Sequence, residues 1–304
     1  MSFQNTISSA VSCTGVGLHS GATVNLKVLP APVDTGIVFR RTDLDGFTVE
    51  ATGRNVAKVS YATSLMKKGV LISTTEHLLS AFIGIGLDNA IVELDNLEVP
   101  ILDGSAKPFV DLVMKAGLRP LRKKRMYMRI KESVEVRDGL KSIAVHPWSG
   151  YSVSYHIDFP TPIGDSTFAV DLMSGKHPQN GHVSIPSNGH SHNGINHGYR
   201  DDIAPARTFG FLHEEPMMRN LGLIRGVSDQ NAIIVTRTGV QNGPLRFEDE
   251  FVRHKVLDLI GDLALLGHPI LGRVVADRAG HAMHTALVSR LLKDRSSWEP
   301  VTLD

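Results

Sequence analysis

Three polar side chains recur at four-residue spacing in the segment RFEDEFVRHKVLDLIGDLALLGHP, Arg246–Pro269. His254, Asp258 and Asp262 would lie on one face of an α-helix, because a step of four residues turns the side-chain direction by only about 40°. The other residues of the segment have the apolar spacing of a buried helix. Burial of an imidazole and two carboxylates is unfavourable unless they bind something charged. The pattern therefore indicates either a divalent metal site or a buried ion network without metal.

A second segment with reactive side chains is STTEHLLSAF, Ser73–Phe82. Ser73 followed three residues later by Glu76 matches a capping box and predicts that a helix begins here. Glu76 and His77 would then lie in the first turn of that helix. Taken alone, the pattern is also explained by a Glu76 that only caps the helix and a His77 that only packs.

Together the two segments supply the ligands of a catalytic zinc site. Two imidazoles (His77 and His254) and one carboxylate (Asp258) leave one coordination position open, as hydrolytic zinc requires. Zinc lowers the pKa of its water to about 7, and the adjacent Glu76 is positioned as general base. The chain has no His-Glu-x-x-His motif, which excludes the zincin class of hydrolases.

His281 is a further candidate, in the sequence GHAMH after the strand-like run Pro269–Ala279. Asp262 follows Asp258 by one helical turn and could hydrogen-bond this imidazole and orient it. Taken alone, His281 has the features of an ordinary loop histidine. With Asp262 it predicts a supporting pair beside the metal site.

The composition restricts the class of protein. The chain has 304 residues, 42% of them hydrophobic, and its 32 basic side chains nearly balance its 31 acidic ones. This neutrality argues against a nucleic-acid partner. Cys13 is the single cysteine, which excludes an internal disulfide framework and indicates a reducing compartment. No secretory signal and no run of about 18 apolar residues is present, so we predict a soluble, cytoplasmic protein without a membrane span.

Strand-like segments followed by helices occur twice along the chain and predict an α+β fold of two domains, 1–125 and 126–304. The basic run Arg119–Arg125 is interpreted as a solvated linker and not as a nucleic-acid patch, because no aromatic residues interleave with it. Gly117 is placed to end a helix. Strands are expected in 22–30, 90–102, 128–138, 142–147, 151–159 and 231–235, and helices in 105–117, 253–266 and 286–293.

Residues 175–202 break this pattern, because they are rich in Gly, Asn and Ser and contain five of the 14 histidines. Such a segment buries too little apolar surface to offset its ordering entropy, so we expect a mobile, peripheral loop. The alternative is a loop that gathers zinc or closes over the substrate, which its position before Thr208 would allow. The five histidines are His177, His182, His190, His192 and His197.

Four motifs occur in a fixed order: STTEHLLSA, ILDGSAKPFV, PARTFGF and DEFVRHKVLDLIGDLALLGH. Together they resemble the zinc-dependent UDP-3-O-acyl-N-acetylglucosamine deacetylases of lipid A biosynthesis. CTGVGLHSG, Cys13–Gly21, is similar to the N-terminal motif of that family, and the match extends to about residue 293. The resemblance implies two similar α+β domains, each a sandwich of a sheet and helices. It also implies an active site at their junction and a βαβ insert in the second domain.

The resemblance implies a role for each residue at a matching position. His77, His254 and Asp258 match the zinc ligands, and Glu76 the general base. His281 matches a histidine that acts as acid or electrostatic stabiliser, with Asp262 as its support. Thr208 matches the threonine that hydrogen-bonds the developing oxyanion. Lys255 and His19 match positions near the diphosphate and sugar, and Phe209 and Phe211 match aromatic residues of the substrate passage.

Two segments are matched less directly. LHEEPMMRNLGLIRG after Phe211 would form the βαβ insert and line an acyl-chain tunnel, with Met217, Met218, Leu221 and Leu223 as its flexible wall. His146 stands where many members of the family carry a lysine of the uridine site.

The predicted function is a zinc metallo-amidase that removes the N-acetyl group of UDP-3-O-(3-hydroxyacyl)-N-acetylglucosamine. The expected partner is that UDP-linked acylated amino sugar, and the expected assembly is a monomer. The proton for the leaving amine would come from His281 or from Glu76. The alternative is a non-catalytic nucleotide-sugar binding or regulatory protein of the same fold, although a binder has no need of an open zinc position.

Overall fold

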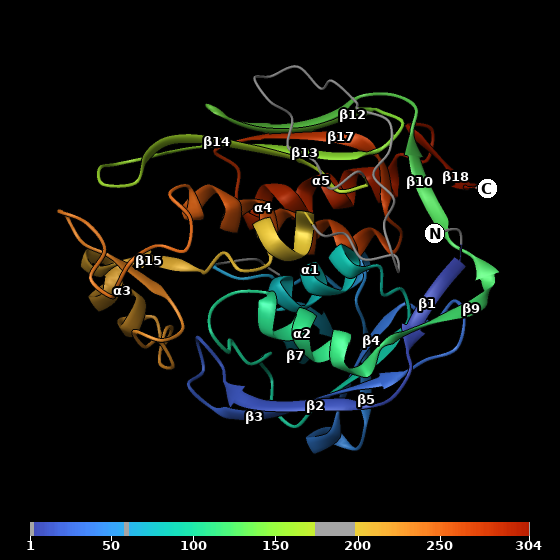
Figure 1. Cartoon of the computed structure of the whole chain (residues 1–304), viewed down its shortest axis with the longest axis horizontal. Helices are drawn as coiled ribbons and strands as arrows, with labels where there is room; N and C mark the ends of the chain where they lie inside the picture. The colour runs from blue at the N-terminus through green and yellow to red at the C-terminus, as the bar shows by residue number, and fades with distance from the viewer. Residues whose placement is uncertain (1–2, 58–60, 174–197, 304) are drawn as a thin grey trace.

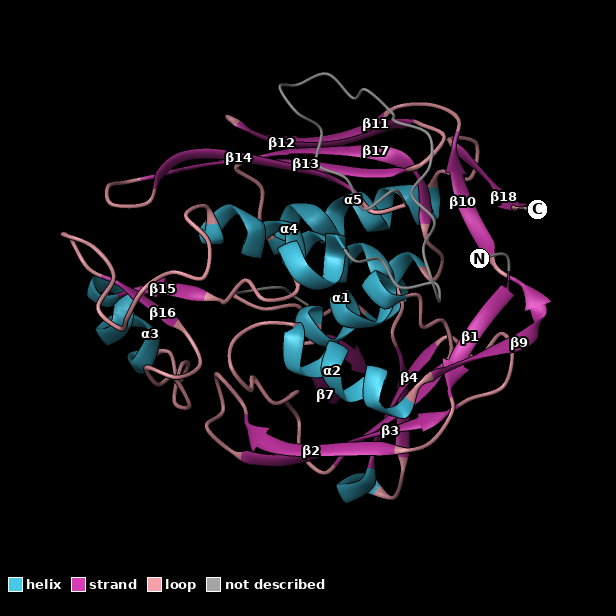
Figure 2. Ribbon diagram, viewed as in Figure 1, coloured by secondary structure: helices cyan, strands magenta, loops and turns pink. Residues whose placement is uncertain are grey.

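The computed structural model describes residues 3–57, 61–173 and 198–303, and within them the chain has the predicted α+β fold. Two β-sheets form the outer layers and helices pack between them (Figure 1). Figure 2 shows the same order, with strands outside and helices in the middle. The central helices are α1 (Glu76–Ile85), α2 (Lys107–Ala116), α4 (Glu250–Leu263) and α5 (His281–Lys293). The histidines of the segment 175–202 lie outside the described residues.

The first sheet has five strands, all from the N-terminal part of the chain. Its inward side chains alternate along β3, where Val24, Leu26 and Val28 are buried and the residues between them are exposed. This period of two is the pattern that predicted the strand. Helix α2 ends at Gly117 as expected. The strand order is β2 (Val11–Val16), β3 (Thr23–Pro30), β8 (Ala90–Leu94), β4 (Ile37–Arg41) and β5 (Phe47–Glu50).

The second sheet has seven strands, all from the C-terminal part of the chain. Strand β17 (Ile270–Asp277) is its centre and pairs antiparallel with β12 and parallel with β10 and β13. Strands β13 and β14 are long and antiparallel to each other. The other strands are β10 (Met126–Ile130), β11 (Val134–Asp138), β12 (Lys141–Pro147), β13 (Tyr151–Phe159), β14 (Gly164–Asp171) and β18 (Trp298–Thr302).

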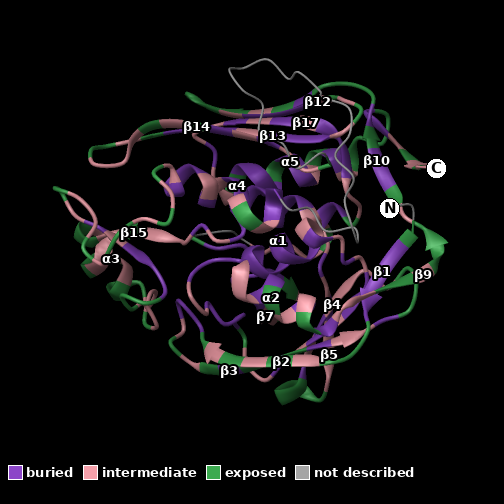
Figure 3. Cartoon of the chain, in the orientation of Figure 1, coloured by how far each residue is buried: buried purple, intermediate pink, exposed green. Residues whose placement is uncertain are grey.

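Helices α1 and α4 pack directly against each other between the sheets, and both are largely buried (Figure 3). Gly261 in α4 lies against the backbone carbonyl of Glu76, and a Cβ atom at this position would overlap it. The two helices that carry the predicted ligands therefore meet backbone to backbone. Among the helices of the described ranges, none is long and apolar enough to cross a bilayer.

A βαβ unit extends from one side of these layers, at the left of Figure 1. Strands β15 (Phe209–Phe211) and β16 (Ile233–Val235) are parallel, and α3 (Glu215–Asn220) lies between them in sequence. This is the insert that the resemblance implied. A short hairpin of β6 (Leu65–Lys67) and β7 (Val70–Ile72) lies just before α1 in the chain.

The capping-box prediction is wrong, although a helix does begin at the predicted place. Helix α1 starts at Glu76, with Thr75 as N-cap and no side-chain cap hydrogen bond. The Ser73 hydroxyl lies 3.0 Å from Ser64 Oγ. The Glu76 carboxylate instead accepts a hydrogen bond from the Thr63 N–H at 3.1 Å, so a segment distant in sequence replaces the expected local partner.

Other boundaries also differ from the sequence prediction, and the segment expected as one strand in 128–138 forms two, β10 and β11. Leu118–Lys124 form strand β9, which pairs antiparallel with β1 (Phe3–Ile7) where a linker was expected. Most side chains of β9 are exposed, so the pairing depends on backbone hydrogen bonds that a basic sequence does not reveal. The strand expected in 90–102 ends at Leu94. Helix α5 begins at His281 and not at residue 286, directly after the extended residue Gly280.

Candidate metal centre and active site

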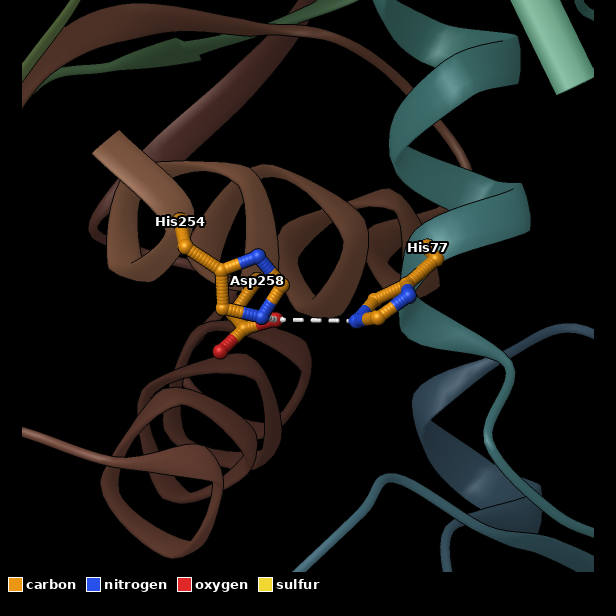
Figure 4. A group of neighbouring side chains, drawn as sticks. All are labelled: His77, His254 and Asp258. Carbon is orange, nitrogen blue, oxygen red and sulfur yellow. Dashed lines mark ion pairs between the residues drawn. The ribbon is translucent and has the colours of Figure 1, made fainter. Parts of the chain in front are cut away.

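His77, His254 and Asp258 converge from two helices, as Figure 4 shows. His77 comes from the first turn of α1, whereas His254 and Asp258 come from successive turns of α4. Asp258 Oδ1 lies 3.5 Å from His77 Nε2 and 3.3 Å from His254 Nε2. The candidate ligand atoms all lie within 4.8 Å of one another, and the three residues are buried. The four-residue spacing in α4 thus brings the predicted side chains together.

Lone pairs of His254 and Asp258 face each other in this cluster. His254 Nδ1 lies 3.0 Å from the carbonyl oxygen of Ala206, which assigns its proton to Nδ1 and frees Nε2 as an acceptor. Burial lowers the pKa of His254 to about 4, so the ring is neutral near pH 7. Asp258 Oδ1 and His77 Nδ1 are buried and have no hydrogen-bond partner among the described residues.

The charge on Asp258 completes the argument for a cation. Burial alone would raise the pKa of Asp258, but positive charge on His254 (when it is protonated at low pH), Lys255 and His281 holds it well below its usual range. An ionised carboxylate oxygen and a neutral imidazole nitrogen at 3.3 Å repel each other unless a cation binds both. Two nitrogens and one carboxylate oxygen therefore fit a metal ion, and the donor set is that of a metal site with an open position.

Lys255 contacts the other oxygen of the same carboxylate. Its ammonium donates a hydrogen bond to Asp258 Oδ2 at 2.6 Å, so Oδ1 is the oxygen left for a metal. The side chain of Lys255 is 15% exposed, in contrast to the 3% of Asp258. The lysine predicted to bind substrate therefore contacts a candidate metal ligand directly.

Glu76 is buried beside this cluster but is not one of its donors. Thr63 N–H holds Oε2, and Oε1 lies 3.8 Å from His281 Nε2. Burial raises the pKa of Glu76 to about 6, against the opposing effect of His281 and His77. A carboxylate with this pKa can accept and return a proton near neutral pH, which suits a general base.

Asp262 is the centre of a hydrogen-bonded cluster behind Glu76. Its Oδ2 accepts hydrogen bonds from His281 Nδ1 and His284 Nδ1, each at 2.8 Å, and its Oδ1 accepts one from the Thr63 hydroxyl. Burial opposes the charge on Asp262, but His281 outweighs it and lowers the pKa of Asp262 to about 2. Because these oxygens already accept three donors, we interpret the cluster as a hydrogen-bond network and not as a second metal site.

The network keeps His281 charged and aimed at the cluster. Burial disfavours the charge, but Asp262 and Asp258 outweigh it and raise the pKa of His281 to about 9. The opposite ring nitrogen, Nε2, lies 3.8 Å from both Glu76 Oε1 and Asp258 Oδ2. A fixed imidazolium therefore faces the same space as the candidate base.

A cavity of about 370 Å³ is lined by the residues predicted to contact substrate, with the exception of Lys255. His19, Thr208, Phe209 and Phe211 all line it. The Thr208 N–H donates to the carbonyl of Gly104, and the Thr208 carbonyl accepts from the N–H of Ile233, both at 2.8 Å. Thr208 is therefore held between the loop before α2 and strand β16.

Comparison with known proteins identifies the fold family. The sequence matches the UDP-3-O-acyl N-acetylglycosamine deacetylase family over residues 4–293. The chain belongs to this family. A protein from Solibacter usitatus (strain Ellin6076), named UDP-3-O-acyl-N-acetylglucosamine deacetylase, is 50% identical over 305 residues, which cover 100% of this chain and 96% of the relative. Similar proteins of the same name come from Chromobacterium violaceum, with 43% identity over 100% of this chain and 95% of the relative, and from Teredinibacter turnerae, with 41% identity over 99% and 94%.

The sequence prediction missed three residues of the hydrogen-bond network around Asp262 in this member of the deacetylase family. Thr63 lies in a loop with no motif around it. His284 follows His281 by three residues, a signal that becomes visible only when α5 is known to begin at His281. The Tyr155 hydroxyl donates to the carbonyl of Ala279 at 2.6 Å and lies 3.1 Å from His284 Nε2, so the network reaches the second sheet.

The wall of the cavity corrects the predicted acyl tunnel of the deacetylase fold. Met218 lines the cavity, but Met217 is 48% and Leu221 62% exposed, and neither is among its lining residues. Leu223 is not among them either; Ile224 is. For Met217 the physical reason is that α3 turns the face with Met218 to the cavity and another face to solvent, whereas Leu221 and Leu223 follow the end of the helix at Asn220.

His146, the other uncertain match, is also accounted for. It lies on β12 with its Nδ1 2.9 Å from Ser133 Oγ, and it does not line the cavity.

Proposed function

We propose that this chain is a zinc-dependent amidase that removes the N-acetyl group of UDP-3-O-(3-hydroxyacyl)-N-acetylglucosamine, a step of lipid A biosynthesis. The observation that carries the proposal is the metal-type donor set of His77, His254 and Asp258 next to Glu76, a buried carboxylate outside the set. Family membership and the names of relatives that cover the whole chain support the substrate.

Zinc is the metal that we propose for this site. Two imidazole nitrogens and one carboxylate oxygen form a donor set typical of hydrolytic zinc. When bound, zinc polarises the amide carbonyl and lowers the pKa of water, which supplies a nucleophile near neutral pH. The tautomer that Ala206 imposes on His254 keeps Nε2 available for the ion.

Glu76, Thr208 and His281 then have separate roles in proton transfer and charge stabilisation. Glu76 takes a proton from the attacking water through Oε1, because Oε2 is already held by the Thr63 N–H. Thr208 and the imidazolium of His281 stabilise the negative charge that develops on the carbonyl oxygen. The leaving nitrogen receives its proton from Glu76 in its acid form or from His281.

Substrate binding is assigned to the cavity and to Lys255. The cavity lined by His19, Phe209 and Phe211 would take the acyl chain and the sugar next to it, and Lys255 would contact the diphosphate or sugar. A cavity of about 370 Å³ is within the size range of ligand sites and is bordered by apolar side chains of the insert.

We further propose that the chain consists of two domains, 1–125 and 126–304, with the active site at their junction. The strands of the five-stranded sheet end at residue 94 and those of the seven-stranded sheet begin at residue 126, which supports this division. The first domain would supply Glu76 and His77, and the second Thr208, the other two ligands and His281. We place the protein in the cytoplasm as a monomer, consistent with its single cysteine.

Metal analysis combined with an acetate-release assay tests the proposed function. We expect about one tightly held zinc per chain, bound by His77, His254 and Asp258, and hydrolysis that a chelator abolishes and added zinc restores. Binding of the UDP-sugar without acetate release would instead favour the non-catalytic alternative. Metal-free protein that is folded and fully active would show that the polar stripe of α4 is an ion network.

The pH dependence of kcat/KM is expected to be bell-shaped. Activity should rise as Glu76 ionises, with a pKa of about 6, and fall as His281 loses its proton, with a pKa of about 9. A bound cation stabilises the anion and disfavours the imidazolium, so metal loading moves both limbs to lower pH. In Asp262→Asn, loss of the carboxylate should lower the alkaline limb by about one unit or more. An alkaline limb that does not move in this variant would remove His281 from the mechanism.

A further inference from the structure

A buried carboxylate outside the metal cluster joins two segments that border the site. Glu98 is 1% exposed and lies between strand β8 and helix α2. Its Oε1 accepts hydrogen bonds from the backbone N–H of His19 and the hydroxyl of Thr74, both at 2.9 Å. Its Oε2 accepts one from the N–H of Ser20 at 2.7 Å. All three donors are uncharged, and a carboxylate is buried in such surroundings only when several hydrogen bonds satisfy it.

The first segment is the turn that leads into α1. Thr74 has a φ of 57°, in the left-handed region that a β-branched residue rarely adopts. Its hydroxyl is held by Glu98, and the backbone of Ser73 pairs with Leu97 and Val99 on either side of Glu98, at 2.8 and 3.0 Å. Because Glu76 follows Thr74 by two residues, this unfavourable turn determines where the candidate base lies.

The second segment is the loop that carries His19. The backbone carbonyls of Leu18 and His19 accept hydrogen bonds from Gly226 N at 3.0 Å and Arg225 N at 3.2 Å, so the loop is joined to the insert. Both Leu18 and His19 line the cavity, and His19 Nε2 is buried without a hydrogen-bond partner among the described residues. Glu98 holds the backbone of this loop, and the His19 ring itself accepts a long hydrogen bond at Nδ1 from the Ile224 N–H at 3.5 Å. Glu98 therefore acts on the position of the imidazole through the backbone.

A close approach in the same loop shows how tightly Glu98 fits. A Cβ atom at Gly17 would overlap both Glu98 Oε2 and Ser20 Oγ, so only glycine leaves room for the carboxylate. Glutamine in place of Glu98 would keep one acceptor oxygen but turn an amide NH₂ towards at least one N–H or O–H donor. The site is built for two acceptor oxygens.

We propose that Glu98 is a positioning residue that holds two segments at a fixed position relative to each other. One arm of the contact is its hydrogen bond to Thr74, in the turn before Glu76, and the other is its hydrogen bonds to the loop of His19. The proposal rests on the proposed deacetylation, because its two arms act on the base and on the substrate cavity. Loss of the Thr74 arm should lower kcat, and loss of the His19 arm should raise KM.

Kinetics of three variants separate the two arms. Glu98→Gln should lower kcat and raise KM, with a fall in kcat/KM of at least about tenfold and unchanged zinc content. Thr74→Val, which removes only the hydroxyl, should lower kcat by about fivefold or more with KM unchanged. Gly17→Ala, whose Cβ displaces the carboxylate itself, should instead lower kcat and raise KM as Glu98→Gln does. The matched control is Glu93→Gln on β8, which removes a partly exposed carboxylate paired with Arg40 at 3.2 Å and should leave both constants unchanged.

The possible results are distinct. Constants for Glu98→Gln within about twofold of wild type overturn the proposal, as does a Thr74→Val variant that raises KM as much as Gly17→Ala does. If Glu98→Gln does not fold, the effects of Thr74→Val and Gly17→Ala on kcat and KM test the proposal in its place. If wild-type protein releases no acetate, the proposed function fails, and hydrogen–deuterium exchange of residues 17–21 and 63–78 then decides on Glu98. Faster exchange of both segments in folded Glu98→Gln supports the positioning role, and unchanged exchange rejects it.

Discussion

Glu76→Gln is expected to keep the metal and to lose nearly all deacetylase activity. The substitution preserves size and the hydrogen bond from the Thr63 N–H, which reaches Oε2 at 3.1 Å. It removes the group that takes the proton, and general-base catalysis typically contributes a factor of about 10²–10⁴. The corresponding rise in the activation barrier is about 3–5 kcal/mol. Single-turnover acetate release and metal analysis of the same preparation measure the two effects separately.

A charge-matched control is available on the surface. Glu50→Gln removes a carboxylate that is paired with Lys67 at 2.8 Å and is 44% exposed, and it should leave the rate near that of wild type. If Glu76→Gln retained activity within a few-fold of wild type, another group would have to be the base. Loss of metal in this variant would instead make Glu76 a ligand.

The second large effect concerns two aspartates one helical turn apart. Asp258→Asn should lose metal, because it replaces the anionic donor oxygen that both imidazoles face at 3.3 and 3.5 Å. Asp262→Asn should keep most of its metal and lose activity by roughly 10–100-fold, as expected when a group that orients the site is removed. Competition with a chromophoric chelator gives metal affinity, and the acetate assay gives the rate.

The pair serves as its own control, because both substitutions remove one buried carboxylate from α4. We expect the loss of metal affinity in Asp258→Asn to exceed the 10–100-fold typical of an outer partner. Equal loss in both variants would mean that Asp262 binds the metal and that its hydrogen bonds to His281 and His284 are not its main role.

The candidate metal cluster was predictable from sequence because its signal is local. His254 and Asp258 are one turn apart in a helix whose apolar spacing is clear, and the geometry of that helix alone puts them on one face. The pairing with His77 needed a chemical argument, since no periodicity links α1 to α4. The strands β3, β12 and β13 were likewise evident from alternation, and the layered α+β fold followed from the order of elements.

What the sequence did not reveal depends on contacts between distant segments. Thr63 supplies both a backbone N–H to Glu76 and a hydroxyl to Asp262, yet nothing in its own neighbourhood distinguishes it. The capping box failed for the same reason, because the tertiary partner of Glu76 replaced the local one. Glu98 acts through three donors that are 24, 78 and 79 residues away. Such relations exist only once the chain is folded.

The contact between Gly261 and the carbonyl of Glu76 has a consequence for efforts to make the protein more robust. A glycine inside a helix is less favourable than alanine by about 1 kcal/mol, so replacing it is a common route to higher stability. At this position the added methyl group would overlap the carbonyl of Glu76 and force α1 away from α4. The candidate base and one candidate ligand would move relative to the other two candidate ligands. Helix α4 therefore has glycine, a poor helix former, at the point where it meets the helix that carries the candidate base.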